Sequence, residues 1–223
     1  MQKKGIFLPQ QTNETCGISC ILMALLAFGR IRKPAPSVMD EKSAEASFYE
    51  MYGGEKPGEG AKKIKGTLGG AIAYALGARR LSVELWHGSE ALMENRDGYY
   101  PPQMHEKMLA AHKAWIDKAE GKTVVRAGMK IDAQTMIDAL NQERLLIVQC
   151  LVEGDADGMH DHVLHWILVF DYRDGEFLAY DPQYQRPSKK APNYITIGQE
   201  EMRTYMDTPV GAAVISVGER RAQ

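Results

Sequence analysis

Residues 16–28 read CGISCILMALLAF, a run that places apolar side chains on nearly every side of a helix. A helix without a polar face is normally buried from all directions, so this one is expected at the centre of the molecule. Gly29 follows it and is a typical residue for ending a helix. The preceding residues 10–15, QQTNET, are polar and predict an exposed loop. The sequence therefore predicts a central helix whose first residue, Cys16, meets a surface loop.

The rest of the chain divides into a helical part and a part rich in strands. Outside the central helix, apolar spacing predicts helices at 39–52, 67–76, 104–119 and 133–140 and a short strand at 81–86. The last third predicts strands at 145–151, 166–172, 177–180 and 212–217, with Asp174-Gly175 as a hairpin turn. Helices followed by an antiparallel sheet indicate an α+β fold. A chain of 223 residues is long enough for one core, and we expect a single domain over residues 1–223.

Three local signals set expected boundaries within this plan. Gly77 is expected to end the helix at 67–76, and Asp132 to cap the start of the helix at 133–140. The glycine-rich residues 53–66 predict a surface loop.

Composition excludes several classes of function. The formal net charge is −2, whereas nucleic-acid binders usually carry a basic excess. No secretory signal is visible, and no apolar run approaches the ~20 residues of a membrane helix. We therefore expect no nucleic-acid partner, no membrane segment and a cytoplasmic location, with export by another route left open.

The chain has three cysteines, Cys16, Cys20 and Cys150, an odd and low count that argues against a disulfide framework. Cys16 stands out because helix-terminal N–H groups and the helix dipole stabilise a thiolate, which is the reactive form of the side chain. Gly17 beside it is expected to leave the approach to the sulfur open. The alternative is that Cys16 is a small buried hydrophobe. Cys20 is expected in the core, with a resolving thiol as its alternative, and Cys150 is expected to be inert.

A nucleophilic cysteine needs a base and a group that orients the base. Of the six histidines, only His165 precedes a strong apolar strand, at residues 166–170. A hairpin turning at Asp174 would bring Asp181, at the end of the return strand, back beside His165. Asp171 and Asp174 compete as the orienting residue, although both lie further along the hairpin. The alternatives are an ordinary strand-edge histidine and an aspartate that starts a turn.

An oxyanion donor would complete such a site. Gln10 lies six residues before Cys16, and its side-chain amide together with the Cys16 backbone N–H would form a two-donor oxyanion hole. Gln11 is the competing donor. Either glutamine can instead be a solvated loop residue.

These motifs resemble those of the papain-like double-glycine leader peptidases, which mature bacteriocin precursors. Gln10, five intervening residues and Cys16-Gly17 resemble the start of that family, and His165-Trp166 with the later Asp181-Pro182 resembles its histidine and aspartate segments. The middle of the chain is similar, more loosely, to stand-alone bacterial relatives. The resemblance implies a papain-like fold, in which a helical half carrying the nucleophile packs on an antiparallel sheet. It also implies a cysteine peptidase that needs no cofactor.

The predicted function is hydrolysis of a peptide bond by a Cys16-His165-Asp181 triad through a thioester, with Gln10 at the oxyanion. The expected partner is a peptide or protein substrate, and Gly17, Trp166 and His162 are expected to contact it. Two alternatives stay open. The same triad would serve an acyltransferase, a transglutaminase-type enzyme or a deamidase. The chain would otherwise be a non-catalytic peptide-binding module of the same fold.

A metal site is the remaining alternative for the histidines. His160, His162 and His165 lie near several aspartates, and two imidazoles spaced as His-x-His can face one side of a strand. The flanking Gly154 and Gly158 favour a solvated loop instead, so no metal is expected.

Overall fold

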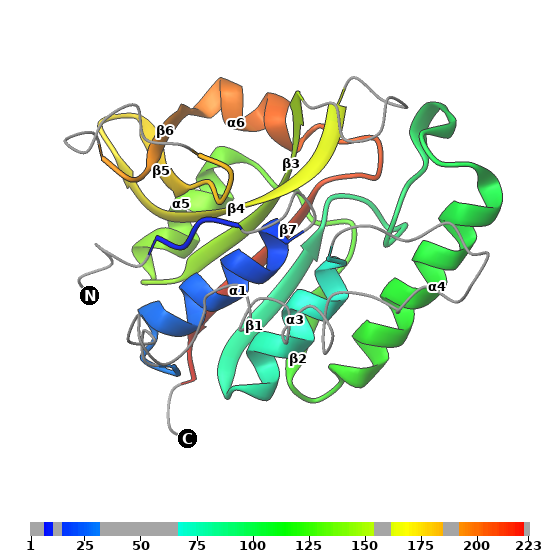
Figure 1. The fold of residues 1–223 in the computed structure, drawn as a ribbon, viewed down its shortest axis with the longest axis horizontal. Helices are drawn as coiled ribbons and strands as arrows, with labels where there is room; N and C mark the ends of the chain where they lie inside the picture. The colour runs from blue at the N-terminus through cyan, green and yellow to red at the C-terminus, as the bar shows by residue number, and fades with distance from the viewer. Residues whose placement is uncertain (1–6, 11–14, 32–66, 154–161, 185–191, 221–223) are drawn as a thin grey trace.

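In a computed structural model of the protein, residues 7–10, 15–31, 67–153, 162–184 and 192–220 are described (Figure 1). The predicted helix at 39–52 and the predicted loop at 53–66 lie outside these residues. The helices are α1 (Cys16–Ala27), α3 (Gly69–Ala78), η2 (Arg96–Gly98), α4 (Pro102–Lys118), α5 (Ala133–Asn141) and α6 (Gln199–Met206). The strands are β1 (Leu81–His87), β2 (Thr123–Arg126), β3 (Leu145–Glu153), β4 (His162–Arg173), β5 (Glu176–Tyr180), β6 (Ile195–Gly198) and β7 (Ala213–Glu219).

The strands form one seven-stranded sheet in the order β2-β1-β7-β3-β4-β5-β6. Most neighbours are antiparallel, which confirms the α+β expectation, but β1 and β2 run parallel to each other. The sheet is thus antiparallel where it carries His165, as expected, and departs from that pattern at this edge. The reason is that β1 and β2 are joined by the long helix α4, and such a crossover allows parallel pairing. No helix among the described residues is both long and apolar enough to cross a bilayer.

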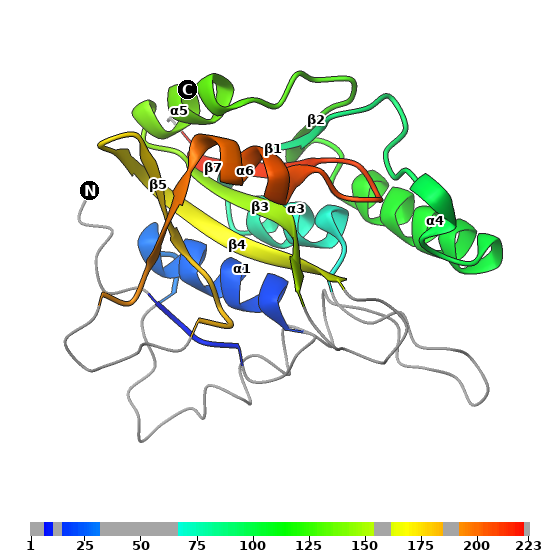
Figure 2. The same ribbon diagram turned by 90° about the horizontal axis from the view of Figure 1, so that it is seen from above.

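Helices cover both faces of the sheet, as Figure 2 shows from above. On one face lie α1 and α3, with α4 packed on α3, and on the other lie α5 and α6. Each face has its own apolar core, one containing α1 and α3 and the other containing residues of α5 and α6. The sheet is thus buried between two layers, and the helix that begins at Cys16 belongs to the first.

The central helix is confirmed. The first ten residues of α1, from Cys16 to Leu25, are all buried. Fully burying one Leu, Ile or Met side chain contributes roughly 1.5–3 kcal/mol, so this helix is a main contributor to the core. It ends as predicted, because Gly29 adopts a positive φ of 62° that favours glycine.

The hairpin of β4 and β5 is also confirmed. Asp174 and Gly175 have φ values of 52° and 88°, the left-handed conformations that a tight two-residue turn requires. The strands pair from Arg173 and Glu176 back to Leu168 and Tyr180, with a register shift near residue 170. Beyond Tyr180 the pairing stops, so the next residue, Asp181, leaves the sheet beside the first part of β4.

Several boundaries differ from the prediction. Gly77 lies inside α3 and does not end it, because the helix continues to Ala78. The glycine is needed there for another reason, since a Cβ on it would come within 3.0 Å of the Lys122 carbonyl oxygen. Asp132 caps α5 as predicted and accepts a hydrogen bond from the Thr135 N–H at 2.9 Å. The strands β2 and β6 and the helix α6 were not predicted.

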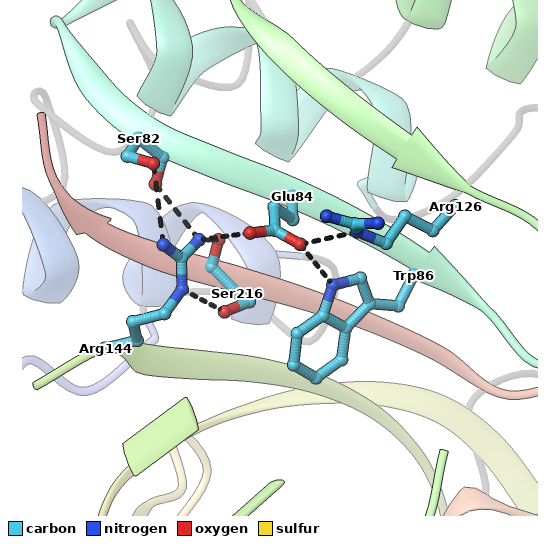
Figure 3. A network of polar contacts seen from close by, with 6 residues as sticks. All are labelled: Ser82, Glu84, Trp86, Arg126, Arg144 and Ser216. Carbon is cyan, nitrogen blue, oxygen red and sulfur yellow. Dashed lines mark hydrogen bonds and ion pairs between the residues drawn. The ribbon is translucent and has the colours of Figure 1, made fainter. Parts of the chain in front are cut away.

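A polar network holds the sheet together on the α5 side, near β1, β2 and β7 (Figure 3). Arg144 donates to the Ser216 carbonyl oxygen at 2.8 Å and lies 3.6 Å from Glu84. Glu84 in turn accepts from Arg126 at 2.7 Å and from the Trp86 indole at 3.2 Å. The ion pairs and the indole hydrogen bond keep Glu84 charged and its pKa low against the opposing effect of burial. This network links side chains of β1, β2 and β7 with Arg144.

Candidate active site

Cys16 is the first residue of α1 and is 4% exposed. The preceding Thr15 makes no side-chain cap, and the first turn contains no acidic residue. No side-chain anion therefore neutralises the positive end of the helix dipole in that turn, and this end stabilises negative charge. Cys16 begins the helix, as the sequence predicted, but its side chain is buried and does not lie at the surface.

His165 and Asp181 are brought together by the hairpin. The His165 Nε2 atom lies 2.7 Å from the Asp181 Oδ1 atom, and the backbone N–H of Gln183 donates to the same oxygen at 2.8 Å. Because Nε2 is engaged by the carboxylate, Nδ1 is the nitrogen left for Cys16, whose side chain also hydrogen-bonds His165. His165 thus contacts both of the other predicted triad residues, Asp181 and Cys16.

The protonation of His165 follows from these neighbours. Burial opposes a charged imidazole, but hydrogen bonds with Asp181 and Cys16, and the negative charge of both, raise the pKa of His165 to about 10. The ring is therefore held as an imidazolium at neutral pH. An imidazolium beside a cysteine favours the thiolate, which is the nucleophilic form.

The competing aspartates are engaged elsewhere. Asp171 forms an ion pair with Arg173, its neighbour on the same strand. Asp174 occupies the hairpin turn with a positive φ. Of Asp171, Asp174 and Asp181, it is Asp181 that contacts His165.

Gln10 lies next to the Asp181-Pro182 segment. Its backbone N–H donates to the Pro182 carbonyl oxygen at 3.0 Å, which fixes the N-terminal segment beside the residue that orients His165. Its side-chain Oε1 atom is enclosed and has no hydrogen-bond partner. The competitor, Gln11, lies outside the described residues, and the oxyanion role of Gln10 stays a prediction.

Gly17 has a packing role that the sequence did not reveal. A Cβ atom on this residue would lie 2.7 Å from the Thr67 Cβ and 3.2 Å from the Ile72 Cδ1. The glycine therefore permits close packing of α1 against the residue that leads into α3. Its expected contact with substrate stays a prediction.

Trp166 is 3% exposed and links β4 to the residues that precede α3. Its indole N–H donates to the Thr67 carbonyl oxygen at 2.8 Å. Trp166, Thr67 and Cys16 line a cavity of about 60 Å³. His162 lies at the start of β4, and its side chain is outside the description.

Two further histidines line the same cavity, and neither was predicted to be near Cys16. The His112 Nε2 atom lies 3.4 Å from the His87 Nε2, and the Gly70 N–H donates to the His112 Nδ1 at 3.2 Å. Because Nδ1 accepts, a neutral His112 carries its proton on Nε2 and donates it to His87. Burial lowers the pKa of His87 to about 4 and that of His112 to about 3. The sequence indicates that His112 faces the protein interior, because it lies one helical turn after the apolar Met108.

The other two thiols are buried in the core, as expected. Cys20 and Cys150 are both 0% exposed, and burial raises the pKa of each thiol well above its usual value. Within the part of the chain that the structure describes, no three His, Cys, Asp or Glu residues gather as metal ligands. The alternative metal cluster includes His160, which lies outside that part.

Comparison with known proteins shows the fold and the family of the chain. The structure superimposes on a crystal structure from Bacillus anthracis, described as that of a C39-like peptidase, with a TM-score of 0.55 and 9% identity over 100% of this chain and 98% of the other. This likeness shows a shared fold. No curated protein is significantly similar in sequence. A family model described as Peptidase C39-like matches residues 6–215. The chain therefore belongs to the Peptidase C39-like family.

Proposed function

We propose that this protein is a cysteine peptidase that hydrolyses a peptide bond through a thioester on Cys16. The observation that carries the proposal is the position of His165, which hydrogen-bonds Asp181 on one side and Cys16 on the other. An acid–base group held between a carboxylate and a thiol is the arrangement that nucleophilic catalysis requires. Membership of the Peptidase C39-like family supports it.

In the first step, the Cys16 thiolate attacks the carbonyl carbon of the scissile bond. The oxygen of the tetrahedral intermediate becomes negative and is stabilised by the Cys16 N–H and the Gln10 side-chain amide. As the C–N bond breaks, the leaving nitrogen takes the proton from the His165 imidazolium. The products of this step are the free amine and a Cys16 thioester.

In the second step, neutral His165 removes a proton from water, and the resulting hydroxide attacks the thioester carbonyl. Collapse of the new tetrahedral intermediate releases the carboxylic acid and regenerates the thiolate and the imidazolium. Throughout, Asp181 accepts from His165 Nε2 and keeps Nδ1 directed toward the sulfur. No metal or organic cofactor enters either step.

The experiment is digestion of a proteome-derived peptide library in ¹⁸O water, followed by mass spectrometry. The proposal expects new carboxyl termini that carry ¹⁸O with wild-type protein and none with Cys16→Ala. Cys150→Ser is the matched control, because it removes another buried thiol, keeps a donor to the His165 carbonyl oxygen and is expected to retain cleavage. Retention of full cleavage by Cys16→Ala would contradict the proposal.

A second arm distinguishes hydrolysis from acyl transfer. Glycinamide is added at millimolar concentration, and an acyltransferase would attach it to the new carboxyl termini instead of water. Conversion of glutamine side chains to ¹⁸O-labelled glutamate, without cleavage, would identify a deamidase. Binding of library peptides without any product would identify a peptide-binding module.

A further inference from the structure

In the described part of the chain, two buried side-chain polar atoms have no hydrogen-bond partner. They are the Thr67 Oγ1 and the Gln10 Oε1. Enclosing a hydroxyl or an amide without a partner costs about 1–3 kcal/mol. Folded proteins tolerate few such atoms, and those that persist are expected at functional sites. Both atoms belong to segments that flank Cys16.

Thr67 is held firmly in this position. Its carbonyl oxygen accepts from the Trp166 indole, one residue after His165 in β4. On its other side it packs against Gly17, so closely that its Oγ1 would lie 3.0 Å from a Cβ on that glycine. The residue is 6% exposed and lines the cavity that Cys16 also lines. Its main chain is thus anchored to the histidine strand, and its side chain packs on Gly17, the residue after the nucleophile.

No hydrogen bond among the described residues uses this hydroxyl. Valine has the same shape as threonine and would fill the space between Gly17 and the cavity with no polar atom to satisfy. By contrast, the buried Thr208 hydroxyl donates to the Gly211 carbonyl oxygen at 2.7 Å. The Thr67 hydroxyl is therefore a polar group without a hydrogen-bond partner among the described residues, and it is available to a bound molecule.

We propose that the Thr67 hydroxyl binds the peptide substrate, by donating a hydrogen bond to a backbone carbonyl oxygen next to the scissile one. This inference rests on the proposed function. The contact requires a staggered position in which the hydroxyl faces the cavity that Thr67 lines, and a rotation by roughly 120° around the Thr67 Cα–Cβ bond is the movement that would supply it. The unsatisfied hydroxyl of the free protein then gains its partner in the complex, which favours binding.

The test compares Thr67→Val and Thr67→Ser with wild type by two measurements. The first is the melting temperature, which Thr67→Val is expected to leave unchanged or raise, because no hydrogen bond is lost. Thr208→Val is the matched control and is expected to lower it, because that hydroxyl has a partner.

The second measurement is the rate at which Cys16 is alkylated by a panel of acetylated tripeptide chloromethyl ketones, relative to iodoacetamide. The peptide reagents require the binding contact and iodoacetamide does not. Thr67→Val is expected to lower the rate with the best peptide reagent about three- to tenfold, the effect of one hydrogen bond, while the iodoacetamide rate stays constant. Thr67→Ser keeps the hydroxyl and is expected to restore the peptide reagent's rate.

The outcomes separate this inference from the proposed function. If no peptide reagent alkylates wild-type Cys16 faster than iodoacetamide does, the proposed function itself is overturned. If a peptide reagent is preferred and Thr67→Val reacts with it as fast as wild type, only the role of Thr67 is overturned. A fall in melting temperature for Thr67→Val would show that the hydroxyl serves the fold and would also overturn that role.

Discussion

Three of the described histidines are buried to nearly the same extent, yet their pKa values differ because their neighbours differ. His87 and His112 are each 3% exposed and His165 is 4% exposed. Burial lowers the pKa of the first two to about 4 and about 3, whereas that of His165 is raised to about 10. Burial alone would keep all three neutral. The difference comes from Asp181 and Cys16, which contact only His165 among the three.

The contact with Asp181 can be tested by Asp181→Asn. The amide can still accept from the His165 Nε2–H, but it lacks the negative charge, so the pKa of His165 is expected to fall well below 10. Peptide cleavage is expected to fall on the order of 10²- to 10⁴-fold, the range for losing the group that orients a catalytic base. The measurement is an NMR titration of the His165 ring.

Asp174→Asn is the control for this change, since it removes the same charge from the hairpin turn. Asparagine tolerates the positive φ at that position, so the pKa of His165 is expected to stay as in wild type. A pKa near 10 for His165 in Asp181→Asn would contradict the account of its charge.

At the scale of elements, the packing of α1 against the start of α3 determines how the nucleophile is held. Gly17 lies in the first turn of α1, where alanine would ordinarily be the better helix former by about 1 kcal/mol. The Thr67 Cβ, 2.7 Å from where an alanine methyl would be, reverses that preference. The clash involves an atom next to the backbone, which cannot move without shifting the chain.

Gly17→Ala is therefore expected to lower the free energy of unfolding by about 1–3 kcal/mol, the usual effect of overpacking. Gly69→Ala is the matched control. It also lies in the first turn of a helix, and its nearest atom, on Trp166, would be at 3.4 Å, an ordinary contact. Urea unfolding of both variants measures the difference. Equal stability of the two would contradict the packing described for Gly17.

Elements with a strong local pattern were predictable from the sequence, and those that depend on distant partners were not. The apolar run at 16–28 and the turn at Asp174-Gly175 identified α1 and the β4–β5 hairpin, and through them the places of Cys16, His165 and Asp181. The strand β2 has four residues and lies at a sheet edge, and β6 is equally short. Segments of that length carry no clear periodicity, and their pairing depends on the rest of the sheet.

The cavity beside Cys16 was unpredictable for a similar reason. Thr67 precedes α3, His87 ends β1 and His112 lies in α4, so their proximity depends on how three elements pack. The sequence placed Thr67 inside a predicted helix and gave it no chemical role. Only the structure shows that its hydroxyl is enclosed without a partner.

At the scale of the whole molecule, the buried histidines make the free energy of unfolding depend on pH. His87 and His112 destabilise the fold at acid pH, whereas the contribution of His165 is lost at alkaline pH. His87 and His112 have folded pKa values below their usual 6.5, so from pH 6.5 down to about 4 the unfolded chain binds more protons. Their contribution to stability is present above pH 6.5 and is lost as the pH falls. The pKa of His165 is raised, so its contribution is complete below pH 6.5 and is lost as the pH rises through about 10.

These groups together place the maximum of stability near pH 6.5. His87 alone is expected to remove roughly 3 kcal/mol from the free energy of unfolding by pH 4. Urea unfolding at pH 4.5, 6.5 and 9 measures this curve. Asp181→Asn is expected to flatten the alkaline side and to leave the acid side unchanged. A protein as stable at pH 4.5 as at pH 6.5 would contradict the burial of neutral histidines.

The central claim is that His165 activates Cys16 as a nucleophile, and alkylation by iodoacetamide at pH 6.5 tests it most directly. Mass spectrometry of tryptic peptides follows all three thiols in one sample, with the buried Cys20 and Cys150 as internal references. The account predicts that Cys16 is labelled first in wild type, and that His165→Ala slows its labelling at least about tenfold. Labelling of Cys16 that is no faster than that of Cys150, or that is unchanged by His165→Ala, would contradict it.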